Sequence, residues 1–271
     1  SKDDRTERKV RNYGDKIIKD AGRGKGHALK LGVEKATGEL IYVLDSDSRI
    51  EKNTISTLIS RLQEDYCGTV GSISIKKGGG VVSMMDRAIH AYFAISELVI
   101  FKLLGTASVL GKNFVLRKRD MKSLEYENSL TEDIGISCDI YRKGKKLKYV
   151  PEAVCRDQPP LKFSHYWKRQ ERWFRGGLTE IAKSSNDMKS FKQYAFVYPV
   201  TVSLIFSPVI VVLYLLGSVI FGRIELLIIG STGFLLIYVA SVKSLDKRDA
   251  AAYPLLFFLV VFIAIAGILH S

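Results

Sequence analysis

The chain has 271 residues, enough for one large domain or two smaller ones; 47% of them are hydrophobic, 25% are charged, and the formal net charge is +13. This excess of positive charge predicts an anionic partner. No zinc-finger, RNP or basic-zipper pattern is present, which argues against a nucleic acid as that partner.

The charge is unevenly distributed along the chain. From position 193 onward there are only four Lys or Arg and three Asp or Glu, so residues 1–192 carry +12 of the formal +13. We therefore predict a polar domain over 1–192 and an apolar region over 193–271. A basic domain beside an apolar region favours an anionic membrane surface, an anionic substrate, or both.

A basic, glycine-rich loop from Gly22 to Gly26 leads into a predicted helix over 27–36. Such a loop can bring Lys25 and backbone N–H groups to a phosphate. It matches neither the Walker pattern nor GxGxxG, so on its own it is a weak indication of a phosphate site.

The segment 39–47 places two carboxylates directly after an apolar run. Residues 40–44 predict a strand buried on both faces, and Asp45 and Asp47 follow its carboxyl end, where open α/β sheets bind ligands. Two such carboxylates repel each other unless a cation neutralises them, which favours Mg²⁺ or Mn²⁺ with a diphosphate. The alternative is an ordinary polar turn.

Further elements alternate along the chain. The first elements are a helix from Asn53, a strand over 68–75 and a helix over 82–104. The apolar part of the helix over 82–104 is interrupted by Glu97 and Lys102. A strand region over 108–117, a helix over 131–142, a strand over 146–155 and a helix around Trp167 follow. This alternation predicts an α/β sheet with parallel strands.

The triplet Thr131-Glu132-Asp133 opens one of these helices. A carboxylate at that position can accept a proton from a sugar hydroxyl. The alternative is that the triplet only caps the helix, because acids suit a helix N-terminus.

The stretch from Arg169 to Trp173 places a guanidinium, that of Arg172, next to an indole. Arginine can hold a diphosphate in a bidentate grip, and tryptophan offers a flat apolar face to a sugar ring. The alternative is a basic amphipathic helix at a membrane surface.

Three long uncharged stretches follow, and each is near the length needed to cross a bilayer. We predict transmembrane helices at about 197–221, 225–242 and 251–269, with buried core helices as the alternative. The loop over 243–249 carries more cationic charge than the loop over 222–225, so the positive-inside rule places residues 1–192 in the cytoplasm. The prediction is a multi-pass protein of the cell membrane.

Taken in order, these motifs resemble those of the membrane-bound family 2 glycosyltransferases, the group that contains cellulose, chitin and hyaluronan synthases. The resemblance covers nearly the whole chain and implies a GT-A fold. It implies that Asp45 and Asp47 hold the divalent metal, Mg²⁺ or Mn²⁺, and that Asp133 is the catalytic base.

The resemblance also divides the other candidate residues between two sides of the site. The donor diphosphate is expected to contact Lys25, Asp45, Asp47 and Arg172. The acceptor is expected to contact Asn113, Glu132, Arg169 and Trp173.

Two features depart from the family pattern. Arg169 stands where the Gln-x-x-Arg-Trp motif begins with Gln, and pairing Gln170 with that motif would break its spacing. In addition, residues 1–6 resemble the segment that follows the second strand of the family domain. We therefore expect an N-terminally truncated GT-A domain without its first strands and without part of the nucleoside pocket.

The function expected from these residues is inverting, metal-dependent glycosyl transfer at a membrane. The donor would be a nucleotide sugar, for which UDP is the expected nucleotide, and the acceptor a polysaccharide or a lipid-linked glycan. Two alternatives are a degenerate, non-catalytic module that binds the lipid bilayer and a nucleotidyltransferase, which would need neither Asp133 nor the Arg-Trp pair.

Overall fold

The computed structural model describes residues 16–19, 22–78, 80–126, 131–185, 216–217 and 220–222. Within these ranges no helix combines the length and the apolar character that crossing a bilayer requires. The three expected spans lie outside the described residues, apart from 216–217 and 220–221, so they stay a prediction.

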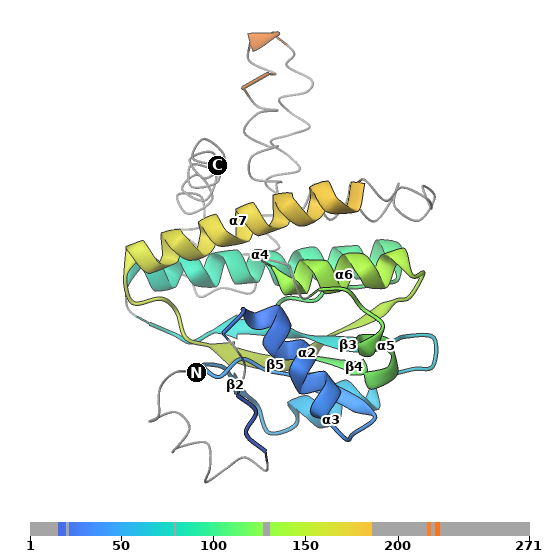
Figure 1. Ribbon diagram of the computed structural model, residues 1–271. Coiled ribbons are helices and arrows are strands. Elements are labelled where there is room, and N and C mark those ends of the chain that lie inside the picture. Colours follow the sequence, from blue (N-terminus) through green and yellow to red (C-terminus); the bar gives the residue numbers. More distant parts are fainter. Residues whose placement is uncertain are drawn as a thin grey trace.

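A single sheet of five strands forms the centre of the described domain, in the order β1-β4-β3-β5-β2. The strands are β1 (Leu40–Val43), β2 (Arg49–Ile50), β3 (Gly68–Ile75), β4 (Phe114–Arg117) and β5 (Leu147–Asp157). The helices are α2 (Lys25–Lys35), α3 (Thr54–Ser60), α4 (Val81–Leu104), α5 (Lys118–Lys122), α6 (Glu132–Arg142) and α7 (Phe163–Ser185). In Figure 1, α4, α6 and α7 lie on one side of the sheet and α3 lies on the other.

The expectation of parallel strands was wrong, because the sheet is mixed. Only β3 and β5 pair in parallel, whereas β4 runs antiparallel to both of its neighbours, β1 and β3, and β2 runs antiparallel to β5. An alternation of strands and helices does not by itself determine the direction of each strand. Here β4 lies between β1 and β3, which share one direction, and runs opposite to both of them.

The region expected to form one strand over 108–117 contains two chain segments, here called the first and second leg, that are joined by a turn. The first leg starts beside β5, where the Ala107 N–H donates to the Leu147 carbonyl at 2.9 Å. The turn follows at Gly111 and Asn113, whose φ values of 80° and 57° lie in the left-handed region that favours glycine and asparagine. The second leg is β4, which begins one residue later.

Alternate side chains of the strands fill two separate cores. On the face of the sheet toward α6, Val43 and Phe114 pack in one cluster with Ile136. On the opposite face, Val115 packs with Leu58 of α3. The sheet is therefore covered on both sides, as expected of an α/β domain. The outermost strand, β1, is only half-buried, less than its apolar sequence predicted, because it lies at an edge of the described sheet.

Asn113 joins three strands from inside the domain. Its side chain is fully buried, and its Nδ2 donates to the carbonyls of Ser72 and Ala153 at 2.9 and 2.8 Å. Its Oδ1 accepts from the Tyr42 hydroxyl at 3.0 Å. These bonds satisfy the backbone where the β3–β5 register shifts, next to Gly71.

Replacing Gly71 with alanine tests how tightly this junction is packed. A Cβ at position 71 would lie 2.3 Å from both the Ala153 carbonyl oxygen and Asn113 Nδ2. We expect Gly71→Ala to lower the free energy of unfolding by about 2–3 kcal/mol, as overpacking does in other cores. Chemical denaturation of the full chain measures this change.

Gly32→Ala is the matched control, because a Cβ on this residue of α2 has no neighbour within 4 Å. It should raise the free energy of unfolding by up to about 1 kcal/mol through helix propensity. Equal stability of Gly71→Ala and the unaltered chain would contradict this account of the junction.

Candidate active site

The ends of four strands meet at one edge of the sheet. β1, β3 and β5 share one direction, so their carboxyl ends lie at the same edge, and β4 starts there because it runs the opposite way. The β1–β4 register pairs Val43 with Phe114, and continuing it by two residues places Asp45 opposite Lys112. Asp157, the last residue of β5, reaches the same place.

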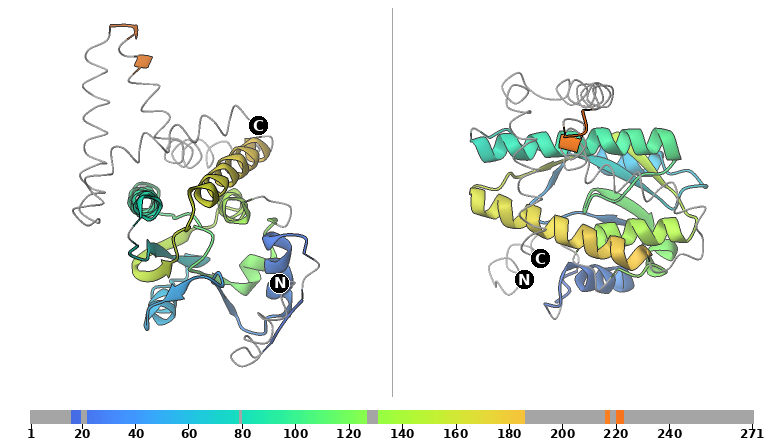
Figure 2. Two further views of the ribbon diagram at one scale, coloured as in Figure 1. Left: turned by 90° about the vertical axis from the view of Figure 1, so that its left-hand side faces the viewer. Right: turned by 90° about the horizontal axis from the view of Figure 1, so that it is seen from above.

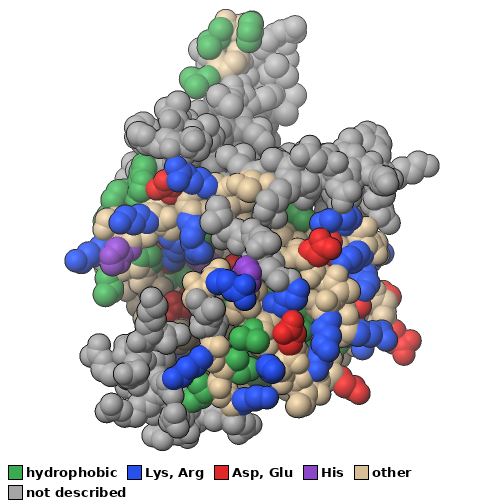
Figure 3. All heavy atoms as spheres, in the orientation of Figure 1, with side chains coloured by type: hydrophobic (Ala, Val, Ile, Leu, Met, Phe, Trp, Pro, Cys, Tyr) green, Lys and Arg blue, Asp and Glu red, His purple; other side chains and the backbone are tan. Residues whose placement is uncertain are grey.

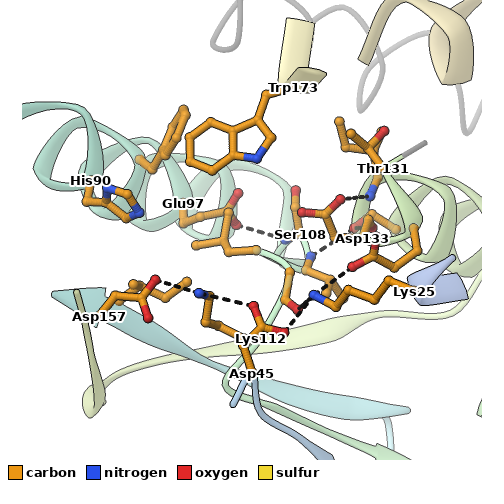
Figure 4. Close-up of a pocket in the computed structure, with 18 of the residues that line it drawn as sticks. Lys25, Asp45, His90, Glu97, Ser108, Lys112, Thr131, Asp133, Asp157 and Trp173 are labelled. Carbon is orange, nitrogen blue, oxygen red and sulfur yellow. Dashed lines mark hydrogen bonds and ion pairs between the residues drawn. The ribbon is translucent and has the colours of Figure 1, made fainter. Parts of the chain in front are cut away.

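Charged side chains at this edge form a continuous row, which Figure 4 shows from Asp157 to Lys25. Lys112 Nζ lies 2.5 Å from Asp157 Oδ2 and 3.1 Å from Asp45 Oδ2. Lys25 Nζ lies 2.8 Å from Asp45 Oδ1 and 2.8 Å from Glu132 Oε1. Asp45 is therefore held between two ammonium groups, one on each carboxylate oxygen.

These pairings hold the three central groups in their charged forms. Burial disfavours the ammonium groups of Lys25 and Lys112, but their carboxylate partners outweigh it, and the pKa of each lysine is raised. Burial also disfavours the Asp45 carboxylate, yet the two lysines lower its pKa below the ordinary value. Lys25, Asp45 and Lys112 are consequently ionised at neutral pH.

The glycine loop predicted near a phosphate sets the position of Lys25. Gly22 and Gly24 have φ values of 69° and 109°, which glycine adopts without strain, and Lys25 is the first residue of α2. Its Nζ also donates to the Gly111 carbonyl at 2.9 Å. The loop therefore directs this lysine toward the carboxylates.

A cavity of about 550 Å³ lies over the charged row. It brings together eight of the nine candidate residues, namely Lys25, Asp45, Asp47, Glu132, Asp133, Arg169, Arg172 and Trp173. Asn113, the ninth, does not line it, because its side chain is buried in the sheet junction described above.

Asp133 lies in the first turn of α6, on the wall of the cavity. Its Oδ1 accepts the Ile134 N–H at 2.9 Å. Its Oδ2 faces Gly111, where a Cβ would come within 3.3 Å, so a glycine at that position leaves the carboxylate room. Burial, together with the neighbouring Glu132, raises the pKa of Asp133 to about 6. A carboxylate of this kind is suited to accept a proton near neutral pH.

Trp173 is held in place by α4 and by its own helix. Its ring centroid lies 6.0 Å from those of His90 and Phe93. The Arg169 guanidinium lies over the indole at 4.9 Å and forms an ion pair with Asp86 of α4, whose side chain is fully buried. Arg169, expected to contact the acceptor, is thus engaged with Asp86 and Trp173.

Arg172 differs from Arg169 in its surroundings. It is exposed at the cavity and makes no hydrogen bond or ion pair with the residues that the structure describes. Its guanidinium is therefore accessible to an anionic ligand.

Four further residues of the cavity and its wall were missed as site residues from the sequence: Lys112, Asp157, Glu97 and Asp86. Lys112 lies in the same short motif as Asn113, but its place opposite Asp45 depends on the direction of β4. Glu97 had a visible signal, a single acid within an apolar helix, and its side chain is only 4% exposed. Burial raises the pKa of Glu97 to about 7, although the Ser108 N–H favours its ionised form.

The composition of the charged row is compatible with a divalent metal. Asp45, Asp47, Glu132 and Asp157 outnumber the two lysines, so the edge retains excess negative charge. Asp47 is exposed and has no partner within the described part of the chain. The described residues contain no group of three or more potential metal ligands, so a metal on Asp45 and Asp47 would depend on a bound diphosphate and water, as Mg²⁺ commonly does.

Comparison with known proteins gives a family match over most of the chain. The model of the family described as "Glycosyl transferase family group 2" matches residues 40–269. This range includes the whole described sheet and the three uncharged stretches, and it begins after α2.

Two curated relatives and one solved structure are similar to the chain. A probable glycosyltransferase, YdaM, from Bacillus subtilis is 26% identical over 60% of the chain and 40% of its own length. A poly-β-1,6-N-acetyl-D-glucosamine synthase from Staphylococcus aureus is 25% identical over 76% of the chain and 52% of its own length. The chain thus spans about half the length of these relatives.

The solved structure is the mannosyltransferase PcManGT from Pyrobaculum calidifontis in complex with GDP-Man and Mn²⁺. It superposes with a TM-score of 0.57 over 96% of this chain and 72% of its own, at 16% identity. This similarity shows that the two chains share the GT-A-like fold.

A double-mutant cycle tests the link between α4 and the Arg-Trp helix. Asp86→Asn leaves the Arg169 guanidinium without its counter-charge, and Arg169→Gln leaves the buried Asp86 carboxylate without the Arg169 counter-charge. Each change should lower the free energy of unfolding by about 3 kcal/mol, and the double variant should lose less than the sum by at least about 1.5 kcal/mol.

The exposed pair Arg61–Glu152 serves as the control for this cycle. Its coupling energy, from Arg61→Gln and Glu152→Gln, should be below about 0.5 kcal/mol. Additive losses at Asp86 and Arg169 would contradict the proposed link.

Proposed function

The chain belongs to the glycosyl transferase family group 2, and from this membership we propose that it transfers a sugar from a nucleotide-sugar donor to a hydroxyl of a glycan or lipid-linked acceptor. One observation carries the proposal: the cavity joins a row of lysines and carboxylates at the strand ends, a further carboxylate with a raised pKa and a fixed indole. These are the groups required to hold a diphosphate, to accept a proton and to bind a sugar ring.

The donor diphosphate binds over the charged row. Lys25 and Lys112 supply ammonium groups already positioned there, and Arg172 supplies an accessible guanidinium. Glu132, which pairs with Lys25, orients that lysine and so acts on the donor side. These cations offset the charge that develops on the departing nucleoside diphosphate.

Asp45 and Asp47 would hold a divalent metal, Mg²⁺ or Mn²⁺. When bound, it would act as a Lewis acid that lowers the charge on the diphosphate oxygens.

Asp133 is the general base. It accepts the proton of the acceptor hydroxyl, whose oxygen forms a bond to the anomeric carbon as the bond from that carbon to the diphosphate breaks. Attack from the face opposite the diphosphate inverts the configuration. The turn at Gly111 places the base beside the loop that carries Lys112, so proton acceptance and diphosphate binding occur in one cavity.

Trp173 provides the platform for the acceptor sugar. Arg169 fixes this platform through the indole and Asp86, and Asn113 shapes the turn that follows Lys112. Both residues therefore support the acceptor side indirectly, in place of the direct contacts that were expected from the sequence.

We place this domain, residues 1–192, on the cytoplasmic face of a cell membrane, anchored in the lipid bilayer by the spans proposed within 193–271. Two observations support the placement: the family match continues to residue 269, and the Arg-Trp helix directly precedes the first proposed span. Lysine and arginine side chains also predominate over acidic ones on the face shown in Figure 3, which suits an anionic donor and an anionic lipid surface.

The names of the relatives direct the choice of donors for the assay. An N-acetylglucosamine polymer synthase and a mannosyltransferase indicate UDP-N-acetylglucosamine and GDP-mannose as the first donors to test. The corresponding acceptors are a β-1,6-linked N-acetylglucosamine tetramer and mannobiose.

Asp133→Asn in the full-length protein is the sharpest test of the proposal. It should reduce transfer by at least about a thousandfold, because the amide cannot accept the proton, and leave the Kd for UDP or GDP within about twofold. In the unaltered protein kcat/KM should be constant above about pH 7 and fall about tenfold per pH unit below pH 6, where Asp133 takes up its proton.

Asp139→Asn is the matched control, since Asp139 is also a buried acid of α6 but does not line the cavity. Its transfer rate should stay within a fewfold of that of the unaltered protein. Undiminished transfer by Asp133→Asn would show that another group is the base.

A further inference from the structure

Glu97 is a buried carboxyl group of the cavity that the proposed reaction does not use. It lies on α4, is 4% exposed and forms part of the cavity wall. Its Oε2 accepts the Ser108 N–H at 2.8 Å. The Ser108 side chain also hydrogen-bonds to Glu97. A carboxylate offers about four acceptor positions, so these two donors leave part of its acceptor capacity for a ligand in the cavity.

A buried carboxylate whose acceptor positions are only partly filled is less stable than one that is fully hydrogen-bonded, because it has lost its contacts with water. The neighbouring cavity residues Phe93, Ala94 and Ile100 offer no side-chain donor to compensate. A ligand with a hydroxyl or amide N–H would fill the remaining positions.

The segment from Ser108 to Gly111 links Glu97 to the proposed base. At one end the Ser108 N–H binds Glu97, and at the other Gly111 lies against Asp133. Between them Val109 donates to the Ser137 hydroxyl, which itself donates to the Asp133 carbonyl, both at 2.8 Å. Glu97 and Asp133 therefore contact the two ends of this four-residue segment, and both line the same cavity.

The Trp173 indole lies above this segment, and Figure 4 shows Glu97 between Trp173 and Ser108. A sugar stacked on the indole would therefore lie next to Glu97, and its hydroxyls project from the periphery of the ring. The cavity has further polar groups at this end, where Ser108 Oγ lies 2.9 Å from the Tyr141 hydroxyl.

We propose that Glu97 is a specificity-determining residue of the acceptor site, which accepts a hydrogen bond from a hydroxyl or amide N–H of the sugar bound on Trp173. This inference rests on the proposed glycosyl transfer. It adds a residue of α4 to the acceptor side, where the sequence placed none.

Such a contact selects among acceptors. A site built around a buried polar group discriminates strongly against an analogue that lacks the matching donor, because the group is then left unpaired. Acceptors with a hydroxyl or amide at this position should bind, and the corresponding deoxy analogues should bind poorly.

Glu97→Gln in the full-length protein tests the proposal, with acceptor KM and nucleotide Kd as separate readouts. The glutamine carbonyl can still accept the Ser108 N–H, so the link between α4 and the loop is kept, but the group facing the cavity becomes an amide N–H₂. With the β-1,6-linked N-acetylglucosamine tetramer or mannobiose as acceptor, KM should rise about tenfold while the Kd for UDP or GDP stays within about twofold.

Asp139→Asn is again the matched control, because Asp139 is buried and accepts a backbone N–H, that of Glu125 at 3.1 Å, but lies outside the cavity lining. Its acceptor KM should not change. The proposal is overturned if Glu97→Gln leaves acceptor KM unchanged, or if it weakens nucleotide binding to the same extent.

Different results would contradict the proposed function and the proposed role of Glu97. If the unaltered protein transfers no sugar from either donor, the proposed function is overturned, and the acceptor role of Glu97 with it. If transfer is normal and only the Glu97→Gln result is negative, the function stands and the assignment of Glu97 does not.

Discussion

The direction of β4 is the constraint on which the candidate site depends. Because β4 runs against β1 and β3, the loop before it reaches the edge at which those strands end. Lys112 is thereby placed opposite Asp45, and its ammonium group joins that carboxylate to Asp157 of β5. A parallel β4 would place this loop at the other edge of the sheet and leave the two carboxylates without a shared cation.

The same loop also connects the two halves of the proposed reaction. Its first part lies under α4 and binds Glu97, and its turn supports Asp133 and accepts a hydrogen bond from Lys25. The turn depends on Gly111 and Asn113, which both adopt positive φ. A small number of backbone constraints therefore positions donor-side cations and the base relative to each other.

The charge balance of the row explains how an anionic donor can approach a set of carboxylates. The lysines neutralise part of the negative charge at Asp45, while Asp47 remains exposed at the cavity. A diphosphate that binds here gains two ammonium groups and meets a carboxylate excess that a divalent cation would offset. The charges of the proposed donor site would thus be balanced when cation and diphosphate are present together.

Local sequence was sufficient to select several residues that the fold brings into one cavity. Asp45 and Asp47 after an apolar strand, Asp133 at a helix start and Trp173 beside Arg172 were all found in this way, and β3 begins and ends where predicted. The direction of β4 could not be predicted, because alternating apolar patterns carry no information on strand orientation.

The residues that were missed depend on contacts between distant parts of the chain. Lys112 acquires its role from β1 and β5, and Asp86 from α7, 83 residues further on. Asn113 was placed at the acceptor because it lies in a recognisable motif, whereas its side chain serves the junction of β3 and β5. These contacts depend on the order and direction of the strands, and the sequence pattern did not predict the direction of β4.

Calorimetric titration of the full-length protein with UDP and GDP, with and without Mn²⁺, tests the central claim most directly. The account predicts that one nucleotide binds at least about tenfold more tightly with Mn²⁺, and that Asp47→Asn removes this difference while Asp139→Asn preserves it. Nucleotide binding that is equally tight without the metal, or unaffected by Asp47→Asn, would contradict the assignment of the strand-end carboxylates to the donor site.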